Sequence, residues 1–225
     1  MGIMKAGFIW AAFLLTLFAG IIHAQSELDQ GLVAYFPFDG NVNDVSSTHA
    51  KAVAYGPVEY QPGIAGTALV LNGHSYVRVE DCPALNLKTF TLSAWVCRFP
   101  NNNNSRILEK GSGHSYWLYL FGERAMGGFF GEDFADAISS SRIPFGKWTH
   151  VCSTYDGSKL CLYMNGSLEA TTAVQDPVAT TSRPLFIGSR GGKTDNWIGG
   201  IDEVKIYNRA LSPAEVEQLF HQVAH

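Results

Sequence analysis

Residues 39–44 read DGNVND, a run whose oxygen-bearing side chains have the spacing found in calcium-binding loops. Calcium takes about six to eight hard oxygen ligands, which Asp and Asn supply. An EF-hand is excluded, because its sixth position requires glycine and holds Asp44, and its twelfth requires glutamate and holds Ala50. The run is therefore either one part of another metal site or a polar turn that follows the strand-like segment LVAYFPF.

The rest of the chain offers little chemistry for catalysis. Adjacent acids occur at Glu80-Asp81 and Asp202-Glu203, but neighbours on a strand point to opposite faces, so neither pair resembles the carboxylates of a glycosidase. The run GGKT at 191–194 resembles the end of a phosphate-binding loop, yet isoleucine stands where that loop needs its first glycine. Neither G-x-S-x-G nor H-E-x-x-H occurs. We therefore expect a protein that is not an enzyme.

Aromatic side chains are abundant enough to supply a binding surface as well as a core. Sugars stack their apolar C–H faces on exposed rings, while Asn, Asp or Arg side chains fix the hydroxyl groups. The candidate ligand-binding residues lie in two expected rim loops and are Phe130, Phe134, Asn196 and Trp197. The alternative is that most of these rings pack in the core, as we expect for Trp95 and Trp148.

The N-terminus has the plan of a secretory signal. Lys5 precedes a continuous apolar run at 7–22, and His23-Ala24 ends that run before polar residues. The run is about 16 residues long, short of the roughly 20 that span a bilayer, so we predict cleavage after Ala24 rather than an uncleaved anchor. The sequence thus predicts a signal peptide at 1–24 and a single domain at 25–225. That domain would be secreted or extracellular, or in a bacterium periplasmic or on the cell surface.

Four cysteines follow this leader, at Cys82, Cys97, Cys152 and Cys161. In an oxidising compartment two disulfides are the simplest expectation. If Asp156-Gly157 forms a two-residue hairpin turn, Cys152 falls opposite Cys161, and Cys82 is left to pair with Cys97. Buried free thiols are the alternative.

The charge of the chain argues against some partners. It has 16 Lys and Arg against 20 Asp and Glu, a formal net charge of −4, and contains no basic run. We therefore expect no nucleic acid partner. Without a basic amphipathic helix or a second long apolar run, we also expect no membrane insertion after signal cleavage.

Short apolar runs rich in β-branched and aromatic residues alternate with turn residues from 31 onward, which predicts a β-sandwich or barrel. The expected strands are 32–38, 67–73, 75–81, 90–99, 115–122, 147–155, 159–166, 183–189 and 200–208. We expect loops at 101–104 and 122–142. Asp156-Gly157 and Asn165-Gly166 predict two hairpins that join three consecutive strands into a meander.

A short helix is expected at the C-terminus. Ser212-Pro213-Ala214-Glu215 combines an N-cap serine, a proline at the first helical position and a glutamate at N3, which together form a capping box. The residues Val216, Leu219, Phe220 and Val223 then fall on one face. We expect this face to pack on the sandwich.

The order of these segments resembles a known family. The runs YFPFDGNVNDVS, GTALVLNGHSYVRVED, GKWTHVCSTYDGSKLCLYMNGSL and WIGGIDEVKIYNRALSPAEVEQL are similar to a laminin-G-like, concanavalin A-like lectin domain over nearly all of 31–221. The resemblance implies an all-β fold, two antiparallel sheets in a jelly-roll sandwich, with the short helix at the C-terminus. A more distant resemblance to pentraxins leaves Cys97–Cys152 open as another disulfide.

The resemblance also implies a structural calcium ion. Family members commonly hold Ca²⁺ where the first strand ends beside the IDEV strand, which implies Asp39 and Asp202 as ligands here, helped by Asn41, Asp44 and backbone carbonyls. Two carboxylates brought together would repel each other without a cation between them. The alternative is that these side chains shape turns and accept backbone N–H bonds.

These observations predict a secreted, calcium-stabilised, lectin-like module that binds extracellular carbohydrate, as free glycan or glycoprotein. The alternative is a protein–protein adhesion or structural module of the same fold without a sugar site. The fold alone does not decide between them, because one architecture carries many functions.

Overall fold

The structure is a computed structural model that describes residues 28–223. The chain from Leu32 onward forms one compact unit. The predicted signal peptide at 1–24 lies outside the described residues, so secretion stays a prediction. Within 28–223, no helix is long and apolar enough to cross a membrane.

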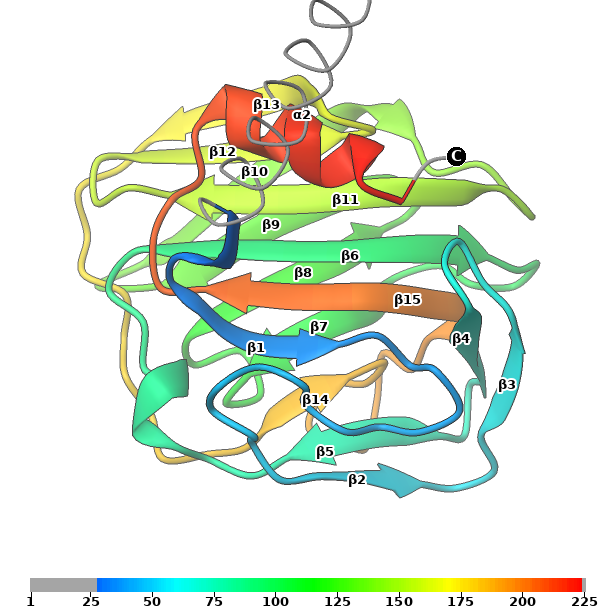
Figure 1. Ribbon diagram of the computed structural model, residues 1–225. Coiled ribbons are helices and arrows are strands. Elements are labelled where there is room, and N and C mark those ends of the chain that lie inside the picture. The colour runs from blue at the N-terminus through cyan, green and yellow to red at the C-terminus, as the bar shows by residue number, and fades with distance from the viewer. Residues whose placement is uncertain (1–27, 224–225) are drawn as a thin grey trace, which may run out of the picture. The chain divides into compact units, whose positions relative to one another are not determined.

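Two antiparallel sheets pack face to face, which confirms the predicted jelly-roll sandwich (Figure 1). The eight-stranded sheet contains β1 (Leu32–Phe36), β3 (Glu59–Pro62), β4 (Thr67–Asn72), β6 (Phe90–Arg98), β11 (Trp148–Tyr155), β12 (Lys159–Met164), β13 (Ser167–Ala173) and β15 (Ile198–Tyr207). Its order is β13-β12-β11-β6-β15-β4-β3, and β1 also pairs with β15.

The seven-stranded sheet contains β2 (Ala52–Tyr55), β5 (Tyr76–Val79), β7 (Ser105–Lys110), β8 (Tyr116–Phe121), β9 (Arg124–Phe130), β10 (Phe134–Arg142) and β14 (Leu185–Ile187). Its order is β10-β9-β8-β7-β14-β5-β2. The apolar core lies between the two sheets, where Phe90, Phe129 and Tyr155 contact one another with ring centroids 4.4 to 6.1 Å apart.

The predicted C-terminal helix is confirmed as α2 (Pro213–His221). Its capping box is complete, since Ser212 Oγ accepts from the Glu215 N–H and the Glu215 carboxylate accepts from the Ser212 N–H. Phe220 stacks on Trp95 of β6 with centroids 5.4 Å apart, so the helix covers part of the outer face of the eight-stranded sheet. In Figure 1 this helix, in red, lies beside β11 and β12.

The predicted meander β11-β12-β13 is confirmed, but only one of its two turns has the predicted form. Asn165-Gly166 is a two-residue turn with φ values of 48° and 77°, as a type I′ hairpin requires. The other turn is displaced, because Tyr155 pairs with Leu160 and the Asp156 N–H bonds Lys159 O. The Asp156 carboxylate accepts the Lys159 N–H and thereby stabilises this register.

The displaced register removes the basis of the predicted disulfides. All four cysteines are free thiols. Cys152 lies opposite Tyr163 rather than Cys161, which lies opposite Thr154. A Cys97–Cys152 bridge is excluded as well: β6 pairs with β11, but Cys97 faces Trp148, four residues and about 13 Å along the strand from Cys152.

The Cys82–Cys97 pairing is wrong too. Cys82 precedes the short 3-10 helix Pro83–Leu85 after β5 of the seven-stranded sheet, whereas Cys97 is near the end of β6 in the other sheet. The two residues therefore belong to different layers of the sandwich. Cys82 is half-buried and Cys97 is buried.

The predicted loop at 122–142 is wrong. It contains β9 and β10, which form hairpins with β8 and with each other. Glycines at 127 and 128 obscured the strand signal, yet both are required by packing. A Cβ at Gly127 would overlap Ser153 of the opposite sheet, and one at Gly128 would overlap Asp136 on the outer face.

Candidate functional site

Strand β15 contains a β-bulge at Asp202 and Glu203. The register shifts between Asp202 and Lys205, and Glu203 has a φ of 50°. Because Ile201 and Val204 both belong to the core, both acids between them are turned away from it, which corrects the prediction that they point to opposite faces. The strand pairs with β4 before the bulge and with β1 after it.

Asp39 and Asp202 converge on the turn between β3 and β4, residues 63–67. Asp202 Oδ2 accepts the Ile64 N–H at 2.9 Å, and Asp39 Oδ1 accepts the Thr67 N–H at 2.8 Å. Side chains on the two glycines of this turn would overlap the two carboxylates. The turn therefore connects the end of β1 to β15, as the resemblance implied.

Asp202 is 0 % exposed, and this burial raises the pKa of its carboxyl group to about 7. The negative charge of Glu203 acts in the same direction. Asp202 also accepts the Ala65 and Glu203 N–H groups, which is the arrangement that the alternative of backbone N–H bonds predicts. The oxygen donors present are nevertheless of the kind that calcium prefers. Among the described residues, no three His, Cys, Asp or Glu side chains gather closely enough to hold a metal, so backbone carbonyls would have to complete any such site.

The other two predicted ligands are engaged in their own loop. The Asp44 carboxylate accepts backbone N–H groups of Tyr35, Ser46 and Ala50 at 2.7 to 2.9 Å. Asn41 bonds the Asp39 carbonyl and the Asn43 N–H. The structure thus brings Asp39 and Asp202 to one turn, while Asn41 and Asp44 shape the loop that delivers Asp39.

A second cluster of polar and aromatic side chains occupies the outer face of the seven-stranded sheet, over β7 to β10. On β8 the residues Tyr116, Leu118 and Leu120 belong to the core, so the residues that alternate with them point outward. The pairing of the strands then defines two rows on the outer face. The first row is Glu109, Trp117, Gly128 and Asp136, and the second is Arg106, Tyr119, Met126 and Ile138.

Arg106 and Glu109 form a buried charged pair beside this aromatic row. Arg106 Nε lies 3.2 Å from Glu109 Oε2, and its guanidinium carbon lies 4.2 Å from the Tyr119 ring centroid. Burial raises the pKa of Glu109 to about 7 and lowers the pKa of Arg106. Arg106 Nε and Glu109 Oε2 are paired with each other as ions without hydrogen-bond geometry, and among the described residues Arg106 Nη1 has no hydrogen-bond partner.

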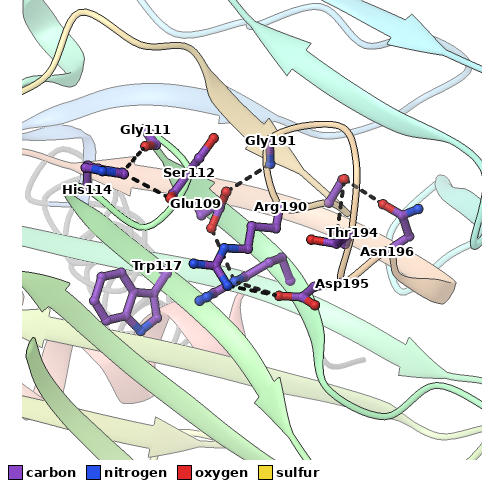
Figure 2. Close-up of polar contacts among 12 residues, drawn as sticks. Glu109, Gly111, Ser112, His114, Trp117, Arg190, Gly191, Thr194, Asp195 and Asn196 are labelled. Atoms are coloured by element: carbon purple, nitrogen blue, oxygen red, sulfur yellow. Dashed lines mark hydrogen bonds and ion pairs between the residues drawn. The ribbon is translucent and has the colours of Figure 1, made fainter.

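A loop before β15, residues 189–196, borders this pair (Figure 2). The Gly191 N–H donates to Glu109 Oε1 at 3.0 Å, and Asp195 Oδ2 lies 3.8 Å from Arg190 and 3.9 Å from Arg106. Figure 2 shows Glu109, Arg190 and Asp195 grouped next to Trp117. Trp117 Nε1 donates to Asp136 Oδ1 at 3.2 Å. Trp117 therefore lies between two carboxylates, Glu109 on β7 and Asp136 on β10.

The predicted ligand-binding residues divide between this surface and the interior. Phe134 is 66 % exposed, and Phe130 contacts it with centroids 5.1 Å apart on the same outer face. Trp197 is a correction: it is 0 % exposed and belongs to the core, where its ring cannot reach a ligand. Asn196 holds its loop, since its amide bonds Ser189 Oγ and Gly73 O.

Sequence reasoning did not select Arg106, Glu109, Trp117 or Tyr119 as site residues. The alternation in YWLYLF, residues 116–121, contains a signal, because a strand with one core face exposes every second ring. No comparable sequence pattern identifies the charged pair of Arg106 and Glu109. Arg106 and Glu109 share a face only because β7 has an irregular register between Arg106 and Leu108.

Comparison with family models matches residues 71–217, more than half of the chain, to the Concanavalin A-like lectin/glucanases superfamily. The chain belongs to this superfamily. The match spans most of the strands described above and confirms the laminin-G-like resemblance. It includes Asp202 and the outer-face residues of β7 to β10, and it begins after Asp39.

Solved structures of similar fold include binding domains. Domain 4 of AbnA, an extracellular arabinanase of Geobacillus stearothermophilus solved with arabinotriose, superposes with a TM-score of 0.73 at 24% identity, over 84% of this chain and 97% of that one. The binding domain of Paraclostridial Mosquitocidal Protein 1 gives 0.76 at 20% identity, over 87% and 53%. The binding domain of Botulinum Neurotoxin DC, solved with SialylT, gives 0.70 at 16% identity, over 87% and 52%. At these identities the similarity shows the fold.

Curated relatives match short stretches. Paraclostridial mosquitocidal protein 1 of Paraclostridium bifermentans is 31% identical over 94 residues, which are 41% of this chain and 7% of that protein. Pappalysin-1 of Mus musculus is 32% identical over 76 residues, or 32% and 5%. The chain therefore spans a small fraction of the length of these relatives.

Proposed function

We propose that the protein is a glycan-binding module whose binding surface is the outer face of β7 to β10. The observation that carries this proposal is the cluster of accessible rings on the outer face, Tyr119, Phe121, Phe130 and Phe134, bordered by the charged side chains of Arg190 and Asp195. Rings stack on the C–H faces of sugars, and fixed guanidinium and carboxylate groups bond hydroxyls. The neighbours solved with arabinotriose and SialylT support the same class of ligand.

Preorganisation favours this surface over the rest of the molecule. The Arg106 guanidinium is held by Glu109, Asp195 and the Tyr119 ring, so little side-chain entropy remains to be lost when a ligand binds. Trp117 is buried, is fixed by its bond to Asp136, and packs against the exposed Phe134 ring with centroids 5.9 Å apart, so it supports that ring. Donors, acceptors and rings are thus fixed on neighbouring strands rather than on mobile loops.

We further propose that a calcium ion stabilises the fold at the turn 63–67. Asp39 and Asp202 would hold it, together with backbone carbonyl oxygens. A bound cation would neutralise the buried Asp202 carboxylate and link the start of the sandwich to β15. In this proposal the ion stabilises the fold and takes no part in sugar recognition, because the sugar surface lies on the other sheet.

The function is tested by an unbiased glycan array probed with the whole protein, with calcium and with a chelator. We expect signal on a defined group of glycans, weakened in a Phe134→Ala variant, which removes a ring that is 66 % exposed on this face, and kept in a Leu168→Ala variant. Leu168 is a matched control, since it is 57 % exposed and lies on β13 of the other sheet. Circular dichroism and a thermal melt verify that both variants are folded.

The absence of any glycan signal from the folded protein with calcium present would overturn the proposal. That result, combined with retention of a protein partner on the same face, would favour the adhesion module instead. Equal signal from the Phe134→Ala variant would move the binding surface elsewhere on the molecule.

A further inference from the structure

Exposed apolar side chains are concentrated on the outer face of the seven-stranded sheet. The large hydrophobic residues that are exposed among the described residues are Val45, Val53, Tyr55, Phe121, Phe134, Ile138, Phe145 and Leu168. Three of them, Phe121, Ile138 and Phe134, belong to β8 and β10, on either side of β9. An exposed apolar patch of this kind on one face marks an interaction site.

These three residues are arranged along the strands rather than across them. Phe134 pairs with Phe130 at one end of β9, Ile138 pairs with Met126 in the middle, and Phe121 pairs with Arg124 at the other end. Phe130 lies six positions after Arg124 on β9. Because a strand rises about 3.3 Å per residue, the apolar row is about 20 Å long. Rings lie at both ends, with Tyr119 6.3 Å from Phe121 and Phe130 5.1 Å from Phe134.

One side of this row is polar, and on the other side β13 of the opposite sheet bonds the edge strand β10, through Thr172 to Asp136 O and through Glu169 to the Ser140 N–H. The loop 189–196, with Arg190 and Asp195, stands next to Arg106 and Glu109 on the β7 side (Figure 2). On the opposite side β10 is the last strand of the sheet. A ligand that uses both the apolar row and the polar border must therefore lie parallel to the strands.

A hollow lies at the Phe121 end of the apolar row. A depression of about 290 Å³ is lined there by Phe121, Glu123, Arg124, Ile138 and Arg142. Arg142 Nη1 lies 2.7 Å from Glu123 Oε2 and is largely exposed. A sugar chain that reaches this end meets a ring, an aliphatic side chain and charged groups that can bond hydroxyls, so the binding surface continues past Ile138.

From this geometry we infer that the ligand is an extended linear oligosaccharide that lies along β8 to β10 and occupies both ends of the row, from Phe134 to Phe121. This inference rests on the proposed function and specifies its substrate class. The row is about 20 Å long, so it accommodates several sugar units in line. A single terminal sugar or a disaccharide would cover one end only.

The test is a length series measured by isothermal titration calorimetry on the whole protein. The probes are cello-, xylo- and arabino-oligosaccharides from disaccharide to hexasaccharide. For the series that binds, we expect affinity to rise at least about tenfold from disaccharide to tetrasaccharide and then to level off. Phe121→Ala and Phe134→Ala should each weaken the hexasaccharide about three- to tenfold, with Leu168→Ala as the control.

The disaccharide decides whether both ends are used at once. It should lose affinity in one of the two phenylalanine variants and keep it in the other, because it covers one end. A hexasaccharide that binds no tighter than the disaccharide, or that responds to only one variant, overturns the inference.

Failure of the inference is distinguishable from failure of the proposed function. If no linear series binds while the glycan array reports terminal or branched sugars, the extended ligand is wrong and the glycan surface stands. If neither the series nor the array gives signal, both are wrong.

Discussion

The Arg106 guanidinium lies over the Tyr119 ring, with its central carbon 4.2 Å from the ring centroid. The two residues face each other on β7 and β8, where the pairing sets Arg106 opposite Tyr119. Glu109 and Asp195 both approach the guanidinium at Nε, at 3.2 and 3.9 Å. This arrangement links the polar border to the aromatic row, so a change in one alters the other.

Replacing Arg106 by lysine should weaken glycan binding about tenfold, a loss of about 1.4 kcal/mol. Lysine keeps the positive charge but lacks the planar group that stacks on Tyr119 and contacts Glu109 and Asp195 together. Titration calorimetry with the best array ligand measures the loss. Unchanged affinity in a folded Arg106→Lys variant would show that charge alone is sufficient.

The Glu109→Gln variant should change the pH dependence of stability. Burial raises the pKa of Glu109 to about 7, whereas in the unfolded chain it titrates near its ordinary value. Between pH of about 4.5 and 7 the folded state therefore binds a proton that the unfolded state does not, and this group makes stability fall as pH rises. Glutamine removes that contribution.

The measurement is denaturant unfolding of both proteins at several pH values from about 4 to 8. The difference between variant and wild type is the relevant quantity, because other groups titrate as well. His150, whose pKa burial lowers to about 3, contributes in the opposite direction: its stabilising effect is lost as pH falls below its unfolded pKa. A difference that does not vary with pH would contradict the buried state of Glu109.

Calcium should raise the melting temperature of the chelated protein, and Asp202→Ala should abolish that rise. The expected gain follows ligand linkage, about 2.7 kcal/mol at a hundred times the dissociation constant. Glu80→Ala controls for the loss of an acid, since Glu80 pairs with Arg78 on the other sheet. A full calcium response in Asp202→Ala would remove Asp202 from the site, and magnesium provides the ion control.

Trp197 and Phe134, both predicted from the sequence to bind ligand, should differ sharply in how much their replacement by alanine destabilises the fold. Trp197→Ala should lower the free energy of unfolding by about 3–5 kcal/mol, because it empties a fully buried position. Phe134→Ala should change it by less than about 0.5 kcal/mol, since that ring is mostly exposed. Urea unfolding at fixed calcium compares them. Comparable losses would contradict the burial of Trp197.

The purified protein should contain four free thiols. Under denaturing conditions without reductant, a thiol reagent should modify Cys82, Cys97, Cys152 and Cys161. In the native state Cys82 should react first, because it is half-buried, while burial raises the pKa of the Cys152 thiol and keeps it unreactive. Reductant should leave the melting temperature unchanged. Mass spectrometry that finds fewer than four modified cysteines would indicate a disulfide.

The sequence by itself determined the architecture and most of the strands. Alternating apolar residues and Gly-containing turns are local signals, and they were sufficient for the sandwich, for the Asn165-Gly166 turn and for α2 with its capping box. The strands, the turn and the helix depend on backbone preferences that each segment carries alone. The family resemblance, rather than any local signal, pointed to Asp39 and Asp202, which the structure places on one turn, and their role as calcium ligands stays a prediction.

Only the tertiary structure decided the register of β11 and β12 and which residues are buried or lie on the outer face of a sheet. A shift of two residues at Asp156 separated Cys152 from Cys161, and no local signal distinguished the two registers. The sequence Gly127-Gly128 is typical of a loop. In the structure, Ser153 of the opposite sheet and the Asp136 side chain leave no room for a larger residue at these positions. Arg106 and Glu109 meet because of an irregularity in β7, and Trp197 is buried because both sheets cover it. The register of a hairpin, an irregular strand and burial between two sheets all depend on packing outside the segment itself, so they are decided only once the two sheets have formed.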